Sequence, residues 1–366
     1  PPSGFLALCS SNLPEPTISP NADTIATDHF ETILYSASSG SAGAGSSTAQ
    51  DIGGLDFKPD WVWIKGRSYA DAHALFDSSR GVGKYLLSNA TNAEGSVADT
   101  LDEFRSDGFG LGADSTALVN YQNNTYVSWN WKANGGTTSS NTDGTITSTV
   151  QANTTAGFSI VLYAGSESNA TVGHGLGGVP DWLIWKKRNG ANDWVVYHSA
   201  NTSEPATDHL HLNNTNATGD AATFFQDTLP TSTVFSIGTD DDVNDAKNYI
   251  VFCFRSIEGY SKFGSYTGNG NADGAFVYLG FRPAFIMLKC QDDASSWNIL
   301  DNKRDPDNTV NQYILPSSAD AEGTLVQADF LSNGIKFRTT NAERNGTRVI
   351  LYMAFAEAPF KYANAR

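Results

Sequence analysis

The feature of this sequence that most constrains its fold is one pattern of apolar segments that occurs three times. Each copy contains a proline-led apolar segment that ends in lysine, at residues 59–65, 180–186 and 283–289, and we call it the first strand of the copy. A second apolar segment follows about 16 residues after each proline, and a strongly apolar closing segment follows about 70 residues after it. Because chance similarity would not keep both the order and the spacing, we interpret the chain as three diverged copies of one unit.

Each copy is expected to be a β-sandwich. Residues 29–35 and 157–163 alternate apolar and polar side chains, which indicates strands with one packed face and one solvated face. The aromatic residues (20 Phe, 14 Tyr and 8 Trp) and the 34 glycines favour short strands joined by turns. About five to seven such strands in a unit of about 100 residues are typical of a sandwich. The predicted fold class is therefore all-β, with three tandem antiparallel β-sandwich repeats of a jelly-roll or lectin-like kind.

The turn-rich segments predict where the units begin and end. A Gly/Thr/Ser/Asn-rich stretch separates the first two copies, whereas the second copy passes directly into the third, so we expect units two and three to pack rigidly together. The chain begins with Pro1 rather than methionine, and we expect it to be a processed or partial product of a longer gene. The predicted parts are an N-terminal extension (1–27), repeat 1 (28–135), a linker (136–156), repeat 2 (157–260) and repeat 3 (261–366).

The charge of the chain excludes two classes of partner. A formal charge of −16 repels phosphate backbones and anionic lipid, so we expect neither nucleic-acid binding nor membrane insertion. No apolar stretch approaches the roughly 18 residues of a membrane-spanning helix. The three cysteines show no disulfide or metal-ligand spacing, and Cys253 and Cys290, which lie in apolar runs, are predicted to be small buried residues, whereas Cys9 lies apart near the start of the chain.

Two groups of residues are candidate metal ligands. Asp240, Asp242 and Asn244 follow the Asp-x-Asp-x-Asn spacing that opens a calcium loop, although Val251 stands where such a loop carries glutamate. The alternative is a solvated turn, in which Asp and Asn are ordinary residues. His209 and His211 alternate on one predicted strand face, where they could bind a metal or form a packed or solvated pair. Calcium is thus the one candidate ion, and no other cofactor is expected.

Four aromatic residues are candidate carbohydrate-binding residues. Aromatic side chains that are exposed on a β-sandwich can stack on sugar rings, and the alternative is that they pack in the core. The lysine that ends each first strand could belong to a site, but we interpret it as the point where the chain re-enters water. The aromatic candidates are Trp131, Trp194, Tyr197 and Trp297.

Catalysis is not predicted. The sequence contains no Gly-x-Ser-x-Gly motif, in which a nucleophilic serine would stand on a sharp turn. No carboxylate recurs at equivalent positions of all three copies, since Asp60 and Asp181 match but the third copy has Ala284. We therefore expect a protein that is not an enzyme and assign no catalytic residue.

Several segments resemble a known family. Residues 57–65, 73–81 and 106–109 resemble a repeated β-domain of uncharacterised virion proteins from tailed phages, and the junction 259–270 and the ending 354–361 also look like that family. Residues 2–14 are similar to the end of a SPRY-like domain that often precedes these repeats. The resemblance covers nearly the whole chain and implies no catalytic residues.

The resemblance implies a non-enzymatic structural protein on the virion surface, on the phage tail or the capsid exterior. A tail fibre or a receptor-binding, adhesin-like component that acts through loop surfaces is the first expectation. Its partners would be other virion proteins, further copies of itself in a homo-oligomer, and a host surface glycan. The alternatives are a capsid-decorating or filament-forming structural protein and, third, a glycan depolymerase.

Overall fold

The structure, a computed structural model, describes residues 10–38 and 47–364. Cys9 and residues 2–9 of the segment that is similar to a SPRY-like domain lie outside the described residues. The strands pair antiparallel within each sheet, which confirms the predicted all-β class. The helices are short: η1 (Ser10–Asn12), η2 (Ala26–Asp28), α1 (Ala222–Phe225), α2 (Asp241–Asn244) and α3 (Ala342–Asn345). None of the helices in the described ranges is long and apolar enough to cross a membrane.

We call residues 28–135, 136–260 and 261–364 units 1, 2 and 3. In unit 1 a large sheet has the order β1-β9-β3-β4-β5-β6 and a small sheet the order β2-β8-β7. The strands of the large sheet are β1 (Phe30–Ser36), β9 (Thr125–Trp131), β3 (Trp61–Gly66), β4 (Ala74–Asp77), β5 (Lys84–Leu87) and β6 (Gly95–Ser96). Those of the small sheet are β2 (Gln50–Gly53), β7 (Leu101–Arg105) and β8 (Gly108–Leu111).

Unit 2 repeats the large sheet with two additional strands at one edge, and its small sheet has two strands instead of three. Its large sheet has the order β10-β11-β12-β19-β14-β15-β16-β17, and its small sheet pairs β13 with β18. The strands are β10 (Ser139–Asn141), β11 (Ser148–Asn153), β12 (Phe158–Ala164), β13 (Ala170–Gly173), β14 (Trp182–Lys187), β15 (Val195–His198), β16 (Asp208–His211), β17 (Gly219–Asp220), β18 (Val234–Ile237) and β19 (Asn248–Phe254).

Unit 3 has two sheets of four strands each, in the orders β20-β27-β22-β23 and β21-β26-β25-β24. Its strands are β20 (Ser261–Thr267), β21 (Phe276–Tyr278), β22 (Phe281–Cys290), β23 (Asn298–Asp301), β24 (Val310–Tyr313), β25 (Gly323–Leu331), β26 (Gly334–Phe337) and β27 (Val349–Pro359). The order β1-β9-β3-β4 of unit 1 therefore recurs as β12-β19-β14-β15 in unit 2 and as β20-β27-β22-β23 in unit 3. In each unit the third strand of this order (β3, β14 or β22) contains the apolar residues and the lysine of the proline-led segment.

The segment 136–156 is not the linker that we expected. It contains β10 and β11, and β11 pairs antiparallel with β12 along five residues from Thr149 to Asn153. The Ser- and Thr-rich composition that favoured a linker belongs to β10 and β11, the two outermost strands at this end of the sheet. In β11, Thr149 is exposed while Val150 on the other face is buried. The predicted limits of the other parts stay predictions.

The central strands of the large sheets are buried on both faces. Along β3, Trp61 and Trp63 belong to a core cluster that all three units share, whereas Val62 and Ile64 belong to a cluster inside unit 1. This is the period-two alternation of a strand, with apolar side chains on both sides. One face thus packs against the small sheet of its own unit, and the other face packs toward the neighbouring units.

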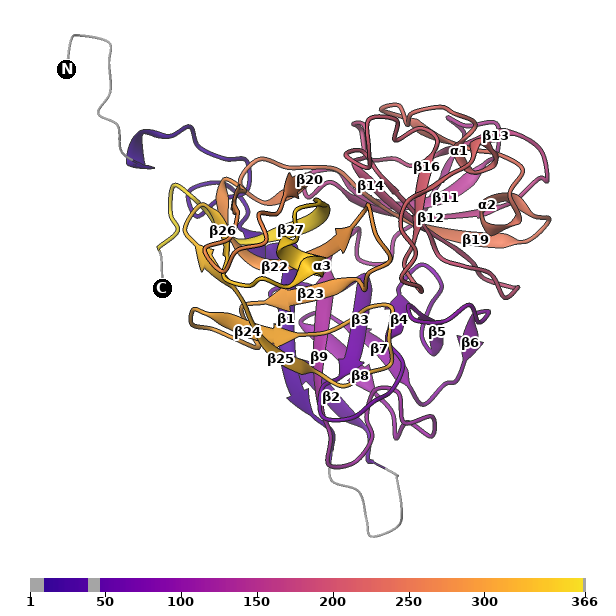
Figure 1. The fold of residues 1–366 in the computed structure, drawn as a ribbon. Coiled ribbons are helices and arrows are strands. Elements are labelled where there is room, and N and C mark those ends of the chain that lie inside the picture. Colours follow the sequence, from indigo (N-terminus) through magenta and orange to yellow (C-terminus); the bar gives the residue numbers. More distant parts are fainter. Residues whose placement is uncertain (1–9, 39–46, 365–366) are drawn as a thin grey trace.

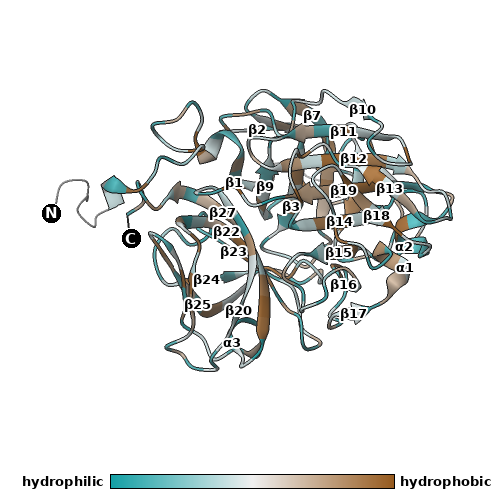
Figure 2. Ribbon diagram, turned by 90° about the horizontal axis from the view of Figure 1, so that it is seen from above, coloured by the Kyte–Doolittle hydropathy of each residue, from teal (hydrophilic) through white to brown (hydrophobic). Residues whose placement is uncertain are grey.

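The shared core holds the three units in one body. The ring of Trp61 lies 4.4 Å from that of Trp131 in unit 1 and 4.3 Å from that of Phe252 in unit 2, centroid to centroid. Trp131 in turn lies 5.8 Å from Phe285 of unit 3. Figure 1 shows the three thirds of the chain gathered around one another rather than strung out in a line. Figure 2 shows that apolar residues concentrate in the strands of the sheets, for example in β12, β19 and β14.

The passage from unit 2 to unit 3 is tightly packed around a glycine. Gly259 has φ +78°, a conformation that residues with a side chain rarely adopt. A Cβ atom at this position would lie 2.8 Å from Pro16 Cβ and 3.1 Å from Pro359 Cβ. Only glycine fits here without displacing the N-terminal segment or the end of β27.

Candidate functional site

The three units contact one another in a cycle at what we call the unit junctions. At each junction a backbone N–H group of one unit donates to a carbonyl oxygen of the next unit. The acceptor residue stands two positions after the lysine that ends the proline-led segment. The bonds run from Glu94 N to Arg188 O (2.7 Å), from Glu322 N to Arg67 O (3.0 Å) and from Thr218 N to Gln291 O (2.9 Å). Unit 2 thereby contacts unit 1, unit 1 contacts unit 3 and unit 3 contacts unit 2. The three units close into a ring.

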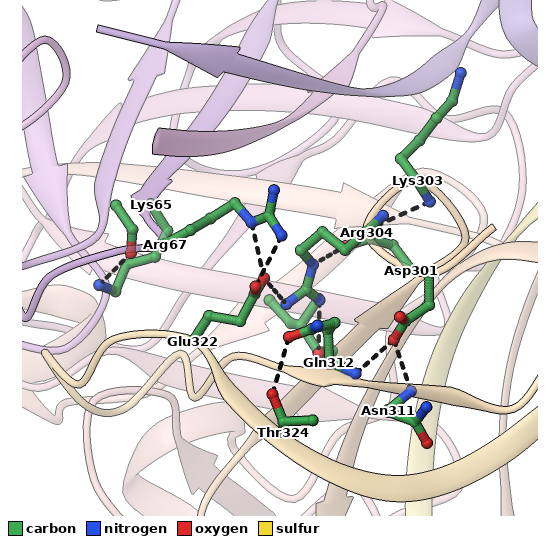
Figure 3. Close-up of polar contacts among 12 residues, drawn as sticks. Lys65, Arg67, Asp301, Lys303, Arg304, Asn311, Gln312, Glu322 and Thr324 are labelled. Carbon is green, nitrogen blue, oxygen red and sulfur yellow. Dashed lines mark hydrogen bonds and ion pairs between the residues drawn. The ribbon is translucent and has the colours of Figure 1, made fainter. Parts of the chain in front are cut away.

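Charged side chains fill the junction between units 1 and 3 (Figure 3). Arg67 of unit 1 binds Glu322 of unit 3 through two hydrogen bonds, Nη2 to Oε1 at 2.8 Å and Nε to Oε2 at 2.9 Å. The same carboxylate lies 3.2 Å from Nη1 of Arg304, whose Nε donates to Asp301 Oδ2 at 2.6 Å. The side chains of Arg304 and Asp301 are fully buried, and Trp129 Nε1 of unit 1 also donates to Asp301 Oδ2 at 3.1 Å. The network joins units 1 and 3 through the partly buried Arg67–Glu322 pair and the buried bond from Trp129 to Asp301.

The junction between units 1 and 2 has the same network. Arg188 of unit 2 binds Glu94 of unit 1 with 2.8 Å between Nε and Oε2, and Glu94 lies 3.2 Å from Nη1 of Arg80. Arg80 also pairs with the buried Asp77. At the third junction neutral groups replace these charges, with hydrogen bonds from Thr202 N to Gln291 Oε1 (3.3 Å) and from Thr218 Oγ1 to Asn201 Oδ1 (2.7 Å).

The lysines that end the first strands do not return to water, so our interpretation of them was wrong. Lys65, Lys186 and Lys289 are fully buried, because a neighbouring unit covers the end of each strand. Lys186 Nζ donates to Thr91 O of unit 1 at 2.8 Å, and Lys289 Nζ donates to Thr215 O of unit 2 at 3.1 Å. Burial lowers the pKa of each of the three ammonium groups to about 8. The lysines are part of the unit junctions.

The four aromatic carbohydrate-binding candidates are also corrected by the structure. Trp131, Trp194, Tyr197 and Trp297 are each at most 2% exposed. Their faces are covered by the core, so no sugar ring can stack on them. Two of them join units instead, since Trp194 Nε1 donates to Leu87 O of unit 1 and Trp297 Nε1 donates to His211 O of unit 2, both at 2.8 Å. His73 stands at the equivalent position of unit 1 and bonds to Leu315 O of unit 3 at 3.0 Å.

Of the predicted calcium ligands, Asp240 and Asp242 lie close together with Asp241, and these three carboxylates could hold a metal ion, whereas Asn244 does not belong to that group. Asp240 is the N-cap of α2 and accepts a hydrogen bond from Asp242 N at 3.0 Å. Asn244 is buried, and its Oδ1 accepts a bond from Ser166 N at 2.7 Å. The Asp-x-Asp-x-Asn spacing is that of a capped helical turn that ends in a structural asparagine.

The structural role of Asn244 is repeated in the other units. A buried asparagine stands shortly before the closing strand in each unit and donates from Nδ2 to a carbonyl oxygen of its own loop. The bonds are Asn120 to Gly112 O (2.8 Å), Asn244 to Gly238 O (2.6 Å) and Asn345 to Thr339 O (2.7 Å). The sequence carries the signal of this role, an asparagine before the closing segment of all three copies, and the prediction of a calcium loop overlooked it.

Asp242 also lies beside two residues from other elements, Asp193 and His211. Each of the residues Asp193, His211 and Asp242 offers one possible ligand atom, and these three atoms lie within 4.8 Å of one another. His209 and His211 were both candidate metal ligands, but His209 does not belong to this group. Its ring is stacked on Phe224, with 3.9 Å between the ring centroids. Asp193 was not predicted, since nothing in its local sequence distinguishes it from a turn residue.

A buried histidine at the junction of units 2 and 3 predicts a dependence on pH. His198 Nε2 bonds to Tyr352 O at 3.2 Å, its Nδ1 accepts from Ala200 N at 2.9 Å, and burial lowers its pKa from 6.5 to about 4. Protonation therefore favours the unfolded chain, and the stability that neutral His198 contributes above pH 6.5 is lost as the pH falls toward 4. We expect a loss of about 2–3 kcal/mol from this residue between pH 6.5 and 4.5.

Denaturant unfolding at both pH values measures this effect. His198→Asn keeps an acceptor for Ala200 N but does not titrate in this range, so its free energy of unfolding should fall by less than that of the unsubstituted protein. Other buried histidines, such as His29, contribute equally to both proteins. An identical fall in the two proteins would show that His198 does not carry the effect.

A family model described as a domain of unknown function (DUF7483) matches residues 25–359. A search of curated proteins finds no match. The matched segment spans all three units, as expected if the complete ring, rather than one unit, is what the family shares.

Proposed function

The chain belongs to the family described as a domain of unknown function, DUF7483, and we propose that it is a non-enzymatic structural protein of a virion surface. The observation that supports the proposal is that the buried polar groups of the protein make contacts between its units. Two lysines, two indole N–H groups and two arginine–glutamate pairs make contacts between units. Perturbed ionisable groups gather either at reactive sites or in structural networks, and here they form networks that hold the units together.

Within this proposal the first candidate is a tail fibre or a receptor-binding component. A body whose central strands are buried on both faces presents mainly loops, sheet edges and the outer faces of the small sheets to other molecules. Loop surfaces of this kind carry recognition on rigid scaffolds. Its partners would be other virion proteins, further copies of the chain and a host surface glycan. The fold by itself does not fix this role, and the resemblance of the repeats to virion proteins is its second support.

An exposed apolar edge favours a second candidate, a capsid-decorating or filament-forming protein. On β21, an edge strand of unit 3, Phe276 is 47% exposed and Tyr278 is 54% exposed. Both stand on the strand that would extend a sheet into another protein chain. The equivalent edge strand of unit 1, β2, carries Asp51 and Gly53 at the matching register positions. Unit 3 therefore offers a contact surface for protein that unit 1 does not.

Mass spectrometry of purified virus particles tests the proposal. We expect peptides from all three units in particles that have been purified away from free protein. Immunogold labelling on the tail would favour the first candidate, and labelling on the head or on free filaments would favour the second. Particles that contain the other structural proteins but lack this chain would contradict the virion assignment. Release of reducing ends from host polysaccharide by the purified chain would contradict the non-enzymatic assignment.

A further inference from the structure

Unit 2 brings together three potential metal ligands from three separate elements. Asp193 lies in the loop two residues before β15, His211 ends β16, and Asp242 lies in α2. Asp193 Oδ2 and His211 Nδ1 are 3.6 Å apart, and the ligand atoms of all three residues lie within 4.8 Å of one another. Their side chains are only partly covered: that of Asp193 is 34% exposed and that of His211 is 14% exposed. An ion could reach the group from solvent.

Neighbouring amides hold both carboxylates in place. Asn213 Nδ2 donates to Asp193 Oδ1 at 2.7 Å, and Asn192 Nδ2 donates to Asp242 Oδ1 at 2.7 Å. Asp193 N adds a second bond to Asp242 Oδ1 at 3.1 Å. In the described parts of the chain no hydrogen bond engages the other oxygen of either carboxylate. Outer hydrogen bonds of this kind orient the ligands of metal sites.

The imidazole of His211 lacks a hydrogen-bond partner on its inner side. Its Nδ1 is buried and makes no hydrogen bond to any described residue, and the 3.6 Å to Asp193 Oδ2 is too long for one. A buried polar atom without a partner is costly and calls for an explanation. A metal ion between Asp193 and His211 would satisfy the nitrogen and the free carboxylate oxygen together.

The charges around the group are predominantly negative. Burial, together with the neighbouring carboxylates of Asp240 and Asp193, raises the pKa of Asp242. The two nearby lysines are engaged elsewhere, since Lys186 Nζ binds carbonyl oxygens of Thr91 and Asn192. Lys187 Nζ lies 3.2 Å from Asp245 Oδ2 and 3.5 Å from Asp241 Oδ2. Among the described residues, no ammonium group forms an ion pair with either of the two carboxylates that lie beside His211.

The fold of the repeat does not require this group. In unit 3, Ser296 N donates to Glu343 Oε1 at 3.0 Å, just as Asp193 N donates to Asp242, but serine stands in place of Asp193. In unit 1, Leu87 pairs with the second strand at the register position of His211. Units 1 and 3 thus form the same sheet without the three ligands.

We infer that Asp193, His211 and Asp242 form a binding site for a divalent transition-metal ion of the Zn²⁺ class. One imidazole nitrogen and two carboxylate oxygens are a usual ligand set for zinc and leave a fourth position open. Calcium instead takes six to eight oxygen ligands, which this group does not supply. The ion would tie α2 to the loop before β15 and to the end of β16.

Calorimetric titration of the full chain with ZnCl₂, after treatment with a chelator, tests this inference. We expect one Zn²⁺ bound per chain, and His211→Gln and Asp242→Asn should each lower the affinity at least about tenfold. Asp241→Asn, on the same helical turn, and His209→Gln, on the same strand, are matched controls that should bind like the unsubstituted chain. Bound Co²⁺ should show a visible absorption band that His211→Gln loses.

Three outcomes would overturn the inference: no zinc binding by the unsubstituted chain, an equal loss of affinity in Asp241→Asn, or calcium binding as tight as zinc binding at the same site. The first would leave the group a set of packed side chains, and the other two would indicate a general attraction of cations by the acidic surface. Circular dichroism in chelator checks that each variant is folded. If His211→Gln does not fold, Asp193→Asn takes its place with the same expected loss.

Discussion

Replacing Trp61 with alanine is expected to lower the free energy of unfolding by about 3–5 kcal/mol. The indole is fully buried and lies in the core that the three units share, stacked against Trp131 of its own unit and Phe252 of unit 2. Its removal leaves a cavity between two units, and the rings around it are held by their own strands and cannot all move in to fill it. The loss should therefore affect units 1 and 2 together.

Denaturant unfolding followed by both tryptophan fluorescence and far-ultraviolet circular dichroism measures the effect of Trp61→Ala. The two signals should move to lower denaturant concentration together. Phe276→Ala is the control, since this aromatic side chain is 47% exposed on an edge strand and its loss should change stability by less than about 1 kcal/mol. A variant in which only part of the signal shifts would show that unit 1 unfolds separately from the others.

Replacing Arg304 with methionine is expected to cost about 3–5 kcal/mol. Methionine keeps much of the volume of the side chain but removes the charge beside Asp301, which is fully buried. The carboxylate of Asp301 would keep its bond from Trp129 Nε1 while losing the cation that offsets its desolvation. Glu322 would also lose its contact with Nη1 of Arg304 and would keep its ion pair with Arg67.

Lys303→Met is the matched control for Arg304→Met. Lys303 also makes an ion pair between units, with 3.0 Å from its Nζ to Glu31 Oε1, but its side chain is 47% exposed. Exposed pairs contribute about 0–1 kcal/mol because water and salt screen them. Thermal unfolding of both variants at one pH compares the two pairs directly. If Arg304→Met costs no more than Lys303→Met, the buried network at the junction does not stabilise the ring.

The sequence was sufficient to predict the all-β class, because the recurring apolar strands and the turn residues between them leave few alternatives. It was not sufficient to predict the ring. Trp61, Val62, Trp63 and Ile64 read as one apolar run, and such a run shows that both faces are covered without showing what covers them. Here one face meets the small sheet and the other meets another unit.

The same limit explains the errors at individual residues. Lys186 has the sequence context of a strand end, and its burial is caused by Thr91 in a different unit. Trp194 has the context of an amphipathic strand, and Leu87 covers its polar end. Both partners are far away along the chain, so local pattern cannot identify them. Asp193 and Asp242 are likewise brought together only by the fold of unit 2.

The central claim is that the three units form one closed body around a shared core. Differential scanning calorimetry of the full chain tests it most directly, because the ratio of the calorimetric to the van't Hoff enthalpy reports how much of a protein unfolds as one unit. We predict a single transition in which the two enthalpies agree. Two or three separate transitions, each with the enthalpy expected of one unit, would contradict the claim.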